Sequence, residues 1–450
     1  MNARLILAAG FGDVDGERAL LAQEAAVTAS DGEGRTALML AAMYGHVDCV
    51  RALLAQNAAV TAVDGEGETA LMSAAIGGHI DCVRALLAHN AEVQVTAVDG
   101  EGEIALMKAA MNGHVDCVAT LLAHDAEVQV TAVDGEGITA LMWGAMNGHV
   151  GCVTALLAHD AKVQVTAVDG TGDGETALMW AAMYGHVDCV TALLAHDAEV
   201  QVTAGDGKGR TALMLAANTG YIDCVRVLLK HDAAVTAVDG RGRTALMWAA
   251  DAGCVDCVRT LLAHDAAVTA ADGKGRTALM RAARNGHVDS ITHLLAHDAE
   301  VQVTAVDGRR ETALMRAAMT GHVGCVTALL AHDVEVQVTA VDGEGRTALI
   351  WAASTGRADC VTTLLAHDAE VAAVDREGST AFRLAVLGSH KSVIAKLMRA
   401  GADIGLPAEY TVVRDMITDM CEFIDIPERV NEIVVAFAQR ALQARASGPP

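Results

Sequence analysis

The sequence predicts an all-α repeat solenoid of about twelve helix-turn-helix units with projecting β-hairpin loops. A segment reading TALM, or a close variant of it, returns every 33 to 37 residues between Thr36 and Thr380. Each copy contains two short helical patterns separated by glycine. Apolar residues make up 52% of the chain but aromatic residues only 3%, so the core must be built from small side chains that suit closely packed helices.

The copy that begins at Thr36 shows how one unit is predicted. Apolar residues at helical spacing (Leu38, Ala41, Ala42) indicate a first helix, which Gly45 ends. A second helix carries one apolar face formed by Val47, Val50, Leu53 and Leu54. Asn57 follows at a position where a left-handed backbone is common, and the glycine-rich stretch VTAVDGEGE predicts a hairpin. A single unit cannot bury its own apolar face, so neighbouring units must stack.

Two residues are inserted before the hairpin in the longer copies, which read EVQVTAVDG. An insertion of two preserves the alternation of a strand, so we expect it to lengthen the hairpin arm and to leave the helices unchanged. The longer arms are predicted to begin at Glu92, Glu127, Lys162, Glu199, Glu300 and Glu335.

These motifs resemble the ankyrin-repeat family from about residue 3 to residue 404. The family's T-P-L-H-x-A signature corresponds to TALMWAA or TALMLAA, followed by GHVDCV and LLAHDA, and the last unit ends AGADI. The chain is also similar to the expanded protist ankyrin proteins called protein 21.1. Alanine replaces the family's proline, and methionine (Met39, Met72) replaces the histidine that braces neighbouring units, so we expect bracing to rely more on apolar packing. The resemblance implies that first helices and hairpins line a concave face where partners bind.

The predicted organisation has three parts. Residues 1–28 form an N-terminal capping unit, residues 29–404 form eleven repeats, and residues 405–450 form a helical C-terminal segment. Two helices are predicted in that segment, at 410–423 and 428–444. The segment is interpreted as a cap over the last unit. A docking element is the alternative, and a faint similarity to the ubiquitin-ligase adaptor boxes that follow some ankyrin arrays is a further one.

The formal charge of −25 argues against broad binding to nucleic acid or to an anionic membrane surface. No apolar run approaches the roughly 20 residues that span a bilayer, and the first residues lack a signal-peptide layout. We therefore expect a soluble, monomeric array in the reducing cytoplasm, with cytoskeletal or nuclear association left open.

The chemistry-bearing residues follow the repeat. Nine of the eleven cysteines fill one repeat position, so the pair Cys254 and Cys257 is a repeat cysteine beside one local substitution. Sixteen of the eighteen histidines fill two repeat positions. The calcium-loop mimic that begins at Asp169 has Trp180 where a carboxylate is required. We expect no enzyme activity, no cofactor and no metal site.

One repeat position varies in a way that suggests binding. We call it the variable column: the residue after the TALM methionine, running from Leu40 to Trp351. It holds all four tryptophans and several cations, and we expect the following members to bind a partner: Trp143, Trp180, Trp248, Trp351, Arg281 and Arg316. Tryptophan and arginine are enriched at binding hot spots. Packing against the next unit is the alternative, and one tryptophan can do both.

The hairpin tips change sign along the chain. Early tips are acidic, with Glu66, Glu68, Glu101, Glu103, Glu136, Asp173 and Glu175. Later tips carry the remaining predicted partner-binding residues: Lys208, Arg210, Arg241, Arg243, Lys274, Arg276, Arg309 and Arg310. Drift between duplicated units would give the same pattern, but a change of sign can also orient an elongated partner.

The leading functional prediction is a non-catalytic scaffold that binds a partner protein along its concave helix and hairpin face. The alternative is a regulatory or targeting subunit that places an enzyme through its C-terminal segment.

Overall fold

The computed structural model describes residues 1–89, 94–124, 126–159, 161–332 and 334–402. These residues form two compact units, Met1–Ala234 and the described part of Val235–Pro450. The predicted C-terminal helices at 410–423 and 428–444 lie outside the described residues.

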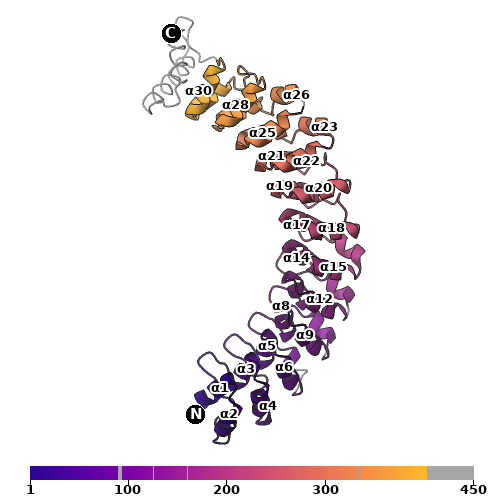
Figure 1. Ribbon diagram of the computed structural model, residues 1–450, viewed down its shortest axis with the longest axis vertical. Coiled ribbons are helices and arrows are strands. Elements are labelled where there is room, and N and C mark those ends of the chain that lie inside the picture. Colours follow the sequence, from indigo (N-terminus) through magenta and orange to yellow (C-terminus); the bar gives the residue numbers. More distant parts are fainter. Residues whose placement is uncertain (90–93, 125, 160, 333, 403–450) are drawn as a thin grey trace. The chain divides into compact units, whose positions relative to one another are not determined.

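Unit 1 is built from seven helix-turn-helix pairs, in which first helices contact first helices and second helices contact second helices. The two layers are visible in Figure 1. Its first helices are α1 (Asn2–Phe11), α3 (Ala37–Met43), α5 (Ala70–Ile76), α8 (Ala105–Met111), α11 (Ala140–Met146), α14 (Ala177–Tyr184) and α17 (Ala212–Thr219). Its second helices are α2 (Val14–Leu21), α4 (Val47–Ala55), α6 (Ile80–Leu87), α9 (Val115–Leu122), α12 (Val150–Leu157), α15 (Val187–Leu194) and α18 (Ile222–Lys230).

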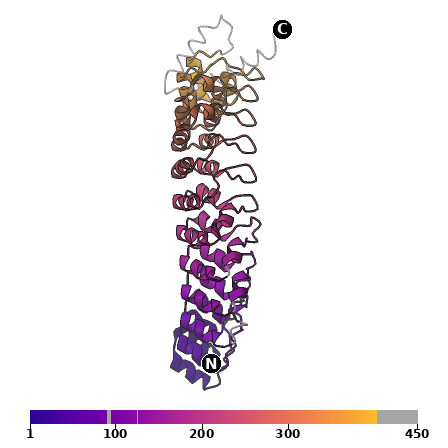
Figure 2. The same cartoon turned by 90° about the vertical axis from the view of Figure 1, so that its right-hand side faces the viewer.

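Unit 2 repeats this arrangement over five pairs. Its first helices are α19 (Ala245–Ala252), α21 (Ala278–Asn285), α24 (Ala313–Thr320), α27 (Ala348–Ser354) and α29 (Ala381–Leu387). Its second helices are α20 (Val255–Ala263), α22 (Val288–Leu295), α25 (Val323–Leu330), α28 (Ala358–Ala366) and α30 (Lys391–Arg399). The prediction of an all-α repeat array is confirmed, and the turns between repeats project from one side of the helices (Figure 2).

A threonine fixes the start of every first helix except α1 and α8. Thr36 Oγ1 accepts a hydrogen bond from the Met39 backbone N–H at 3.3 Å, which satisfies one of the amides that a helix leaves free at its start. In the same turn the Met39 sulfur accepts the Thr36 N–H at 3.3 Å. Ile104 begins α8 without a side-chain cap, because it has no oxygen to accept the bond.

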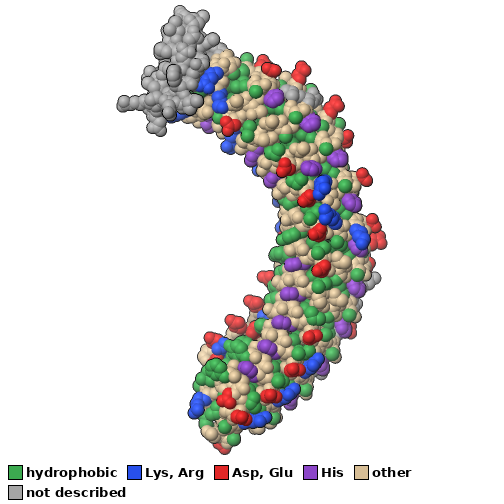
Figure 3. All heavy atoms as spheres, in the orientation of Figure 1, with side chains coloured by type: hydrophobic (Ala, Val, Ile, Leu, Met, Phe, Trp, Pro, Cys, Tyr) green, Lys and Arg blue, Asp and Glu red, His purple; other side chains and the backbone are tan. Residues whose placement is uncertain are grey.

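The junction between the two helices also joins neighbouring repeats. His79 Nε2 lies 3.0 Å from the Met43 carbonyl oxygen, 36 residues earlier, and the equivalent histidines of most described repeats make the same contact. Gly45 has a left-handed φ of 75°, and a Cβ there would lie 2.6 Å from the His79 ring. These histidines recur at intervals along the face seen in Figure 3. Repeats are therefore braced by a histidine-to-carbonyl contact as well as by apolar packing.

The prediction for the two-residue insertion is wrong for the five longer copies that the structure describes, whereas the arm predicted to begin at Glu92 starts outside the described residues. The described residues of the longer copies form short helices, α10 (Ala126–Thr131), α13 (Ala161–Thr166), α16 (Ala198–Thr203), α23 (Ala299–Thr304) and α26 (Val334–Thr339). No β-strand occurs in the described ranges, where the β pairing consists of two isolated bridges, Ser30 with Thr36 and Val374 with Thr380.

A buried glutamine explains why the insertion becomes helical. Gln129 is fully buried, and its Nε2 donates to the Leu121 carbonyl at 2.9 Å and to the His124 carbonyl. The Leu121 carbonyl lies at the end of α9, where backbone N–H groups also bond it, and the His124 carbonyl lies just beyond, so the glutamine adds a donor where the helix ends. Adjacent Gln129 and Val130 are both buried, which a strand facing one core cannot achieve. The inserted helices also contact one another, α10 with α13 and α13 with α16 in unit 1, and α23 with α26 in unit 2.

Candidate protein-binding surface

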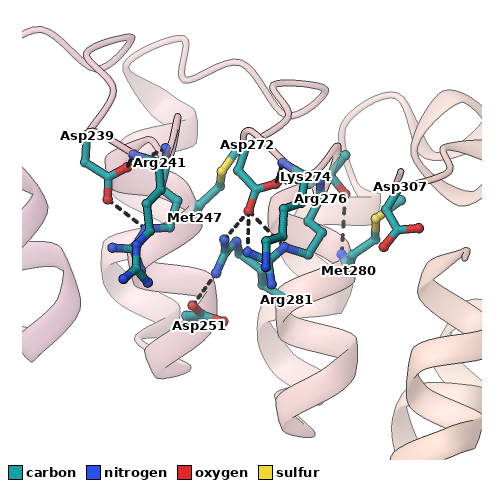
Figure 4. Close-up of polar contacts among 12 residues, drawn as sticks. Asp239, Arg241, Met247, Asp251, Asp272, Lys274, Arg276, Met280, Arg281 and Asp307 are labelled. Atoms are coloured by element: carbon teal, nitrogen blue, oxygen red, sulfur yellow. Dashed lines mark hydrogen bonds and ion pairs between the residues drawn. The ribbon is translucent and has the colours of Figure 1, made fainter. Parts of the chain in front are cut away.

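An aspartate carboxylate organises each turn between repeats. Asp272 Oδ1 accepts the backbone N–H groups of Lys274 at 2.8 Å and Arg276 at 2.9 Å (Figure 4). The Gly273 N–H donates to the Arg241 carbonyl of the preceding turn at 2.8 Å. The same bonds recur in other described turns, so each turn is closed by its own aspartate and most turns are tied to the turn before.

These bonds define a position that we call the tip residue, the second residue after the turn aspartate. At Arg241, Lys274 and Arg309 the N–H is bound to the aspartate and the carbonyl to the next turn. Their side chains are exposed. The fold therefore uses the main chain of a tip residue and leaves its side chain facing solvent.

The tryptophans of the variable column are half-buried and three of them bond the turn aspartate. Trp143 Nε1 donates to Asp134 at 3.0 Å, Trp180 Nε1 donates to Asp169 at 3.1 Å, and Trp351 Nε1 donates to Asp342 at 3.0 Å.

Trp248 differs from the other three tryptophans. Its buried Nε1 has no hydrogen-bond partner, and the Arg243 guanidinium lies 3.6 Å from the ring centroid. The turn aspartate of this repeat, Asp239, instead accepts a hydrogen bond from Arg243 Nε at 2.7 Å.

The two arginines of the variable column are buried ion-pair partners. Arg281 is 7% exposed and joins Asp251 of α19 to Asp272, each at 2.5 Å (Figure 4). Arg316 is 8% exposed and pairs with Asp307 and with Glu311 at 3.1 Å. Burial alone would raise the pKa of Asp272, but hydrogen bonds from Arg276, from backbone amides and from Arg281 lower that pKa to about 2.

Three predicted cations lie beside the column and are also engaged. Arg210, Arg243 and Arg276 are largely buried and each pairs with the aspartate four residues earlier. Arg210 in addition reaches Asp173 and Glu175 of the preceding turn, at 3.2 and 2.8 Å. These guanidinium groups are paired with turn carboxylates and stabilise the turns, so little of their positive charge is available to a partner.

The other five predicted cations are exposed: Lys208, Arg241, Lys274, Arg309 and Arg310. Lys208 pairs with Asp173 at 2.5 Å. Arg310 has a left-handed φ of 62°, at the position where neighbouring turns have Gly275 and Gly242. A side chain in that conformation costs roughly 1–2 kcal/mol, so the turn retains Arg310 against its backbone preference.

The acidic turns of unit 1 surround one lysine of the variable column. Lys108 lies 2.7 Å from Asp99, 3.6 Å from Glu68 of the preceding turn, and in contact with Glu103. Burial raises the pKa of Glu68 and of Glu103, while Lys108 partly offsets this rise. The tip residues Glu66, Glu101 and Glu136 remain exposed.

The turn aspartate is the residue whose role the sequence interpretation missed. The signal was the recurrence of Asp before Gly in every turn, from Asp31 to Asp342. The pattern predicts a hairpin, whereas the carboxylate accepts bonds from three of the tryptophans, from Arg281 and Arg316 and from Lys108 of the variable column.

The cysteines of the described residues do not form a centre of their own. Cys254 is a free, partly exposed thiol, and Cys257 is buried. Within the described part of the chain, no group of three or more His, Cys, Asp or Glu side chains is placed to hold a metal ion. None of the described helices combines the length and apolar character needed to cross a membrane.

A family model described as ankyrin repeats (3 copies) matches residues 5–99, 95–169, 165–239, 233–305 and 314–408. The chain belongs to the ankyrin repeat family. Ankyrin repeats are generally protein–protein interaction modules and are typically non-catalytic, and these matches identify no catalytic domain. Comparison with curated proteins finds no match. For this ankyrin array, the face formed by first helices and turns is accordingly the candidate surface for a protein partner.

Proposed function

We propose that this chain is a non-catalytic scaffold that binds a partner protein through the face formed by its first helices and turns. The observation that carries the proposal is the row of exposed tip cations in unit 2, Arg241, Lys274 and Arg309. The fold fixes their backbone and makes no use of their charge. Exposed, evenly repeated cations on rigid turns suit recognition of an extended partner.

The half-buried tryptophans support the same face. Each is held in place, three by the turn aspartate and Trp248 by Arg243 across its ring. A positioned aromatic side chain loses little conformational entropy on binding, which favours its use as an anchor. Trp248 also carries the Arg243 guanidinium on its ring, so an aromatic face and a cation lie together on this surface. Arg281 and Arg316 would stabilise this surface and would not attract the partner by charge, because Asp272 and Asp307 neutralise their guanidinium groups.

Three further points are parts of this proposal. They are the finer similarity to the protist proteins called protein 21.1, the three-part division at residues 28 and 404, and the monomeric, cytoplasmic character of the chain. The targeting alternative depends on residues 405–450, which lie outside the described residues.

Site-specific crosslinking tests the proposal. A photo-crosslinking amino acid is placed at Arg241, on the proposed face, and in a separate protein at Arg259, an exposed residue of the second helix α20. Each full-length protein is used to capture partners, and adducts are identified by mass spectrometry. The proposal requires one protein species to crosslink from position 241 at several times its yield from position 259. Equal yields, or adducts from position 259 alone, would refute it.

A further inference from the structure

Unit 2 contains a pocket of about 500 Å³ on its turn side. Residues from three consecutive repeats line it: Lys274, Arg284, Arg309, Arg316, Met319 and Trp351 are among them. This volume lies within the usual range for ligand pockets, roughly 300–1,000 Å³.

The lining carries an excess of positive charge. It has five cationic side chains and two carboxylates, Asp307 and Glu311. Both carboxylates pair with Arg316. Arg276, the fifth cation, pairs with Asp272.

Three of the cations have nothing in the described structure to neutralise them. No ion pair or side-chain hydrogen bond is made by Lys274, Arg284 or Arg309 among the described residues. They come from two successive turns and from the last turn of α21, and they converge on one cavity. Charges of one sign brought together without partners repel one another, and an anion between them removes that repulsion.

A second observation points to a ligand. Arg316 is 8% exposed, and its buried Nε has no hydrogen-bond partner. A buried guanidinium N–H without an acceptor costs free energy that an acceptor oxygen would recover. Met319 and Trp351 give the pocket an apolar wall beside these donors, and both are half-exposed.

We infer that this pocket binds an acidic segment of a protein partner, whose carboxylates meet Lys274, Arg284 and Arg309 while an apolar side chain covers Met319 and Trp351. The inference rests on the proposed function and specifies the chemistry of the partner. The formal charge of −25 on the whole chain does not prevent binding, because physiological salt screens charges beyond about 8 Å.

The test uses the full chain and a fluorescein-labelled peptide of five glutamates around one phenylalanine, followed by fluorescence anisotropy. The pocket variant is K274Q/R284Q/R309Q. Its matched control, R51Q/R226Q/R259Q, removes the same charge from exposed second-helix residues whose partners are the aspartates three positions away. Because the three pocket side chains make no bonds in the fold, the pocket variant is expected to retain its circular dichroism spectrum.

We expect the pocket variant to weaken peptide binding at least tenfold and the control variant to weaken it less than twofold. A peptide with glutamine in place of glutamate should bind at least tenfold more weakly. No binding of the glutamate peptide, equal weakening by both variants, or equal displacement by inorganic phosphate at matched charge would overturn the inference.

Two further readouts identify other occupants. Sedimentation of the parent at increasing concentration tests whether the acidic turns of a second copy fill the pocket. If the parent self-associates and the pocket variant does not, the occupant of the pocket is a second copy of this chain and not a separate partner. If the peptide fails but position 241 still crosslinks a partner, only this inference falls and the proposed function stands.

Discussion

Replacing Arg281 with methionine tests whether the variable column serves the fold before it serves a partner. Arg281 spans two repeats of unit 2 through Asp251 and Asp272, each at 2.5 Å. Hydrogen bonds to charged groups contribute about 1.5–3 kcal/mol each. The Asp251 side chain is 29% exposed and regains water, whereas Asp272 is buried but keeps Arg276 and two backbone donors. We therefore expect Arg281→Met to lower the free energy of unfolding by about 2 kcal/mol.

The assay is urea denaturation at pH 7, with hydrogen exchange to localise the loss to α19 and α21. The control is Arg259→Met, which breaks a pair of similar length, 2.7 Å, between side chains that are 59% and 66% exposed. Exposed pairs contribute about 0–1 kcal/mol, so this control should change little. If the two variants lose the same stability to within about 0.5 kcal/mol, the buried ion pair is not structural and the reasoning fails.

The acid dependence gives the same prediction a second readout. The pKa of Asp272 is lowered from 3.8 to about 2 in the folded protein. A lowered carboxyl pKa contributes stability that is present above pH 4 and is lost as the pH falls toward 2. Part of that contribution comes from Arg281, so the stability difference between the parent and Arg281→Met should shrink across this range. A difference that stays constant from pH 5 to pH 2 would contradict the assignment.

Four other predictions concern single positions. Trp248→Phe should speed dissociation of the captured partner severalfold without changing its association rate, which surface plasmon resonance measures. Cys254 should be the described cysteine that thiol reagents label first in the native protein, because it is partly exposed and the other described cysteines are buried. Burial raises the pKa of the Cys254 thiol and raises that of the Cys152 thiol to about 11. A stoichiometric disulfide at Cys254 in mass spectra would contradict this. Burial raises the pKa of Glu17 from 4.5 to about 7. The folded protein should therefore lose up to about 3 kcal/mol of stability as the pH rises from 4.5 to 7. Glu17→Gln should remove that pH dependence, which urea titrations at several pH values measure. Gln129→Leu should cost about 1–3 kcal/mol by removing the buried donor that bonds the Leu121 and His124 carbonyls, seen as faster hydrogen exchange in α9 and α10.

The helical framework could be predicted from the sequence because each constraint is local and repeated. The threonine cap, the apolar spacing of the second helix and the left-handed residue after it all lie within one repeat. Asn57 illustrates this, since it was predicted as a left-handed residue and has a φ of 59°. A local change has a local effect, as at Ile104, which has no oxygen to cap α8.

The inserted segments could not be predicted in the same way because their pattern fits two structures. A run such as AEVQVT is too short to distinguish a strand from a helical turn by periodicity. The outcome depends on the position of Gln129 beneath the end of α9, and on the contact of α10 with α13 in the next repeat. Both are tertiary contacts, absent from the local sequence.

The candidate surface could be predicted only in part, because the geometry of the turn decides which groups the side chains of the variable column contact. Trp143 and its turn aspartate, Asp134, are nine residues apart, and a turn brings them to 3.0 Å. From sequence alone, a column of tryptophan and arginine fits both a partner-binding row and a row of donors to a buried acid. The structure shows the second arrangement, and partner contact by the same side chains stays a prediction.

The turn geometry indicates which positions can change to suit a partner at the least cost to the stability of the fold. A residue of the variable column faces the turn carboxylate, so the column favours donors such as Lys108, Arg281 and Trp351. Where the column residue is Leu215, Arg210 supplies the donor instead. The side chain of a tip residue is not constrained by the turn carboxylate in this way, because the two hydrogen bonds of a tip residue are made by its main chain. The change from Glu66, Glu101 and Glu136 to Arg241, Lys274 and Arg309 at this position therefore costs the fold little. Charge at the tips is the property of this array that a partner can set most independently of stability, and it is the property that the pocket variant removes.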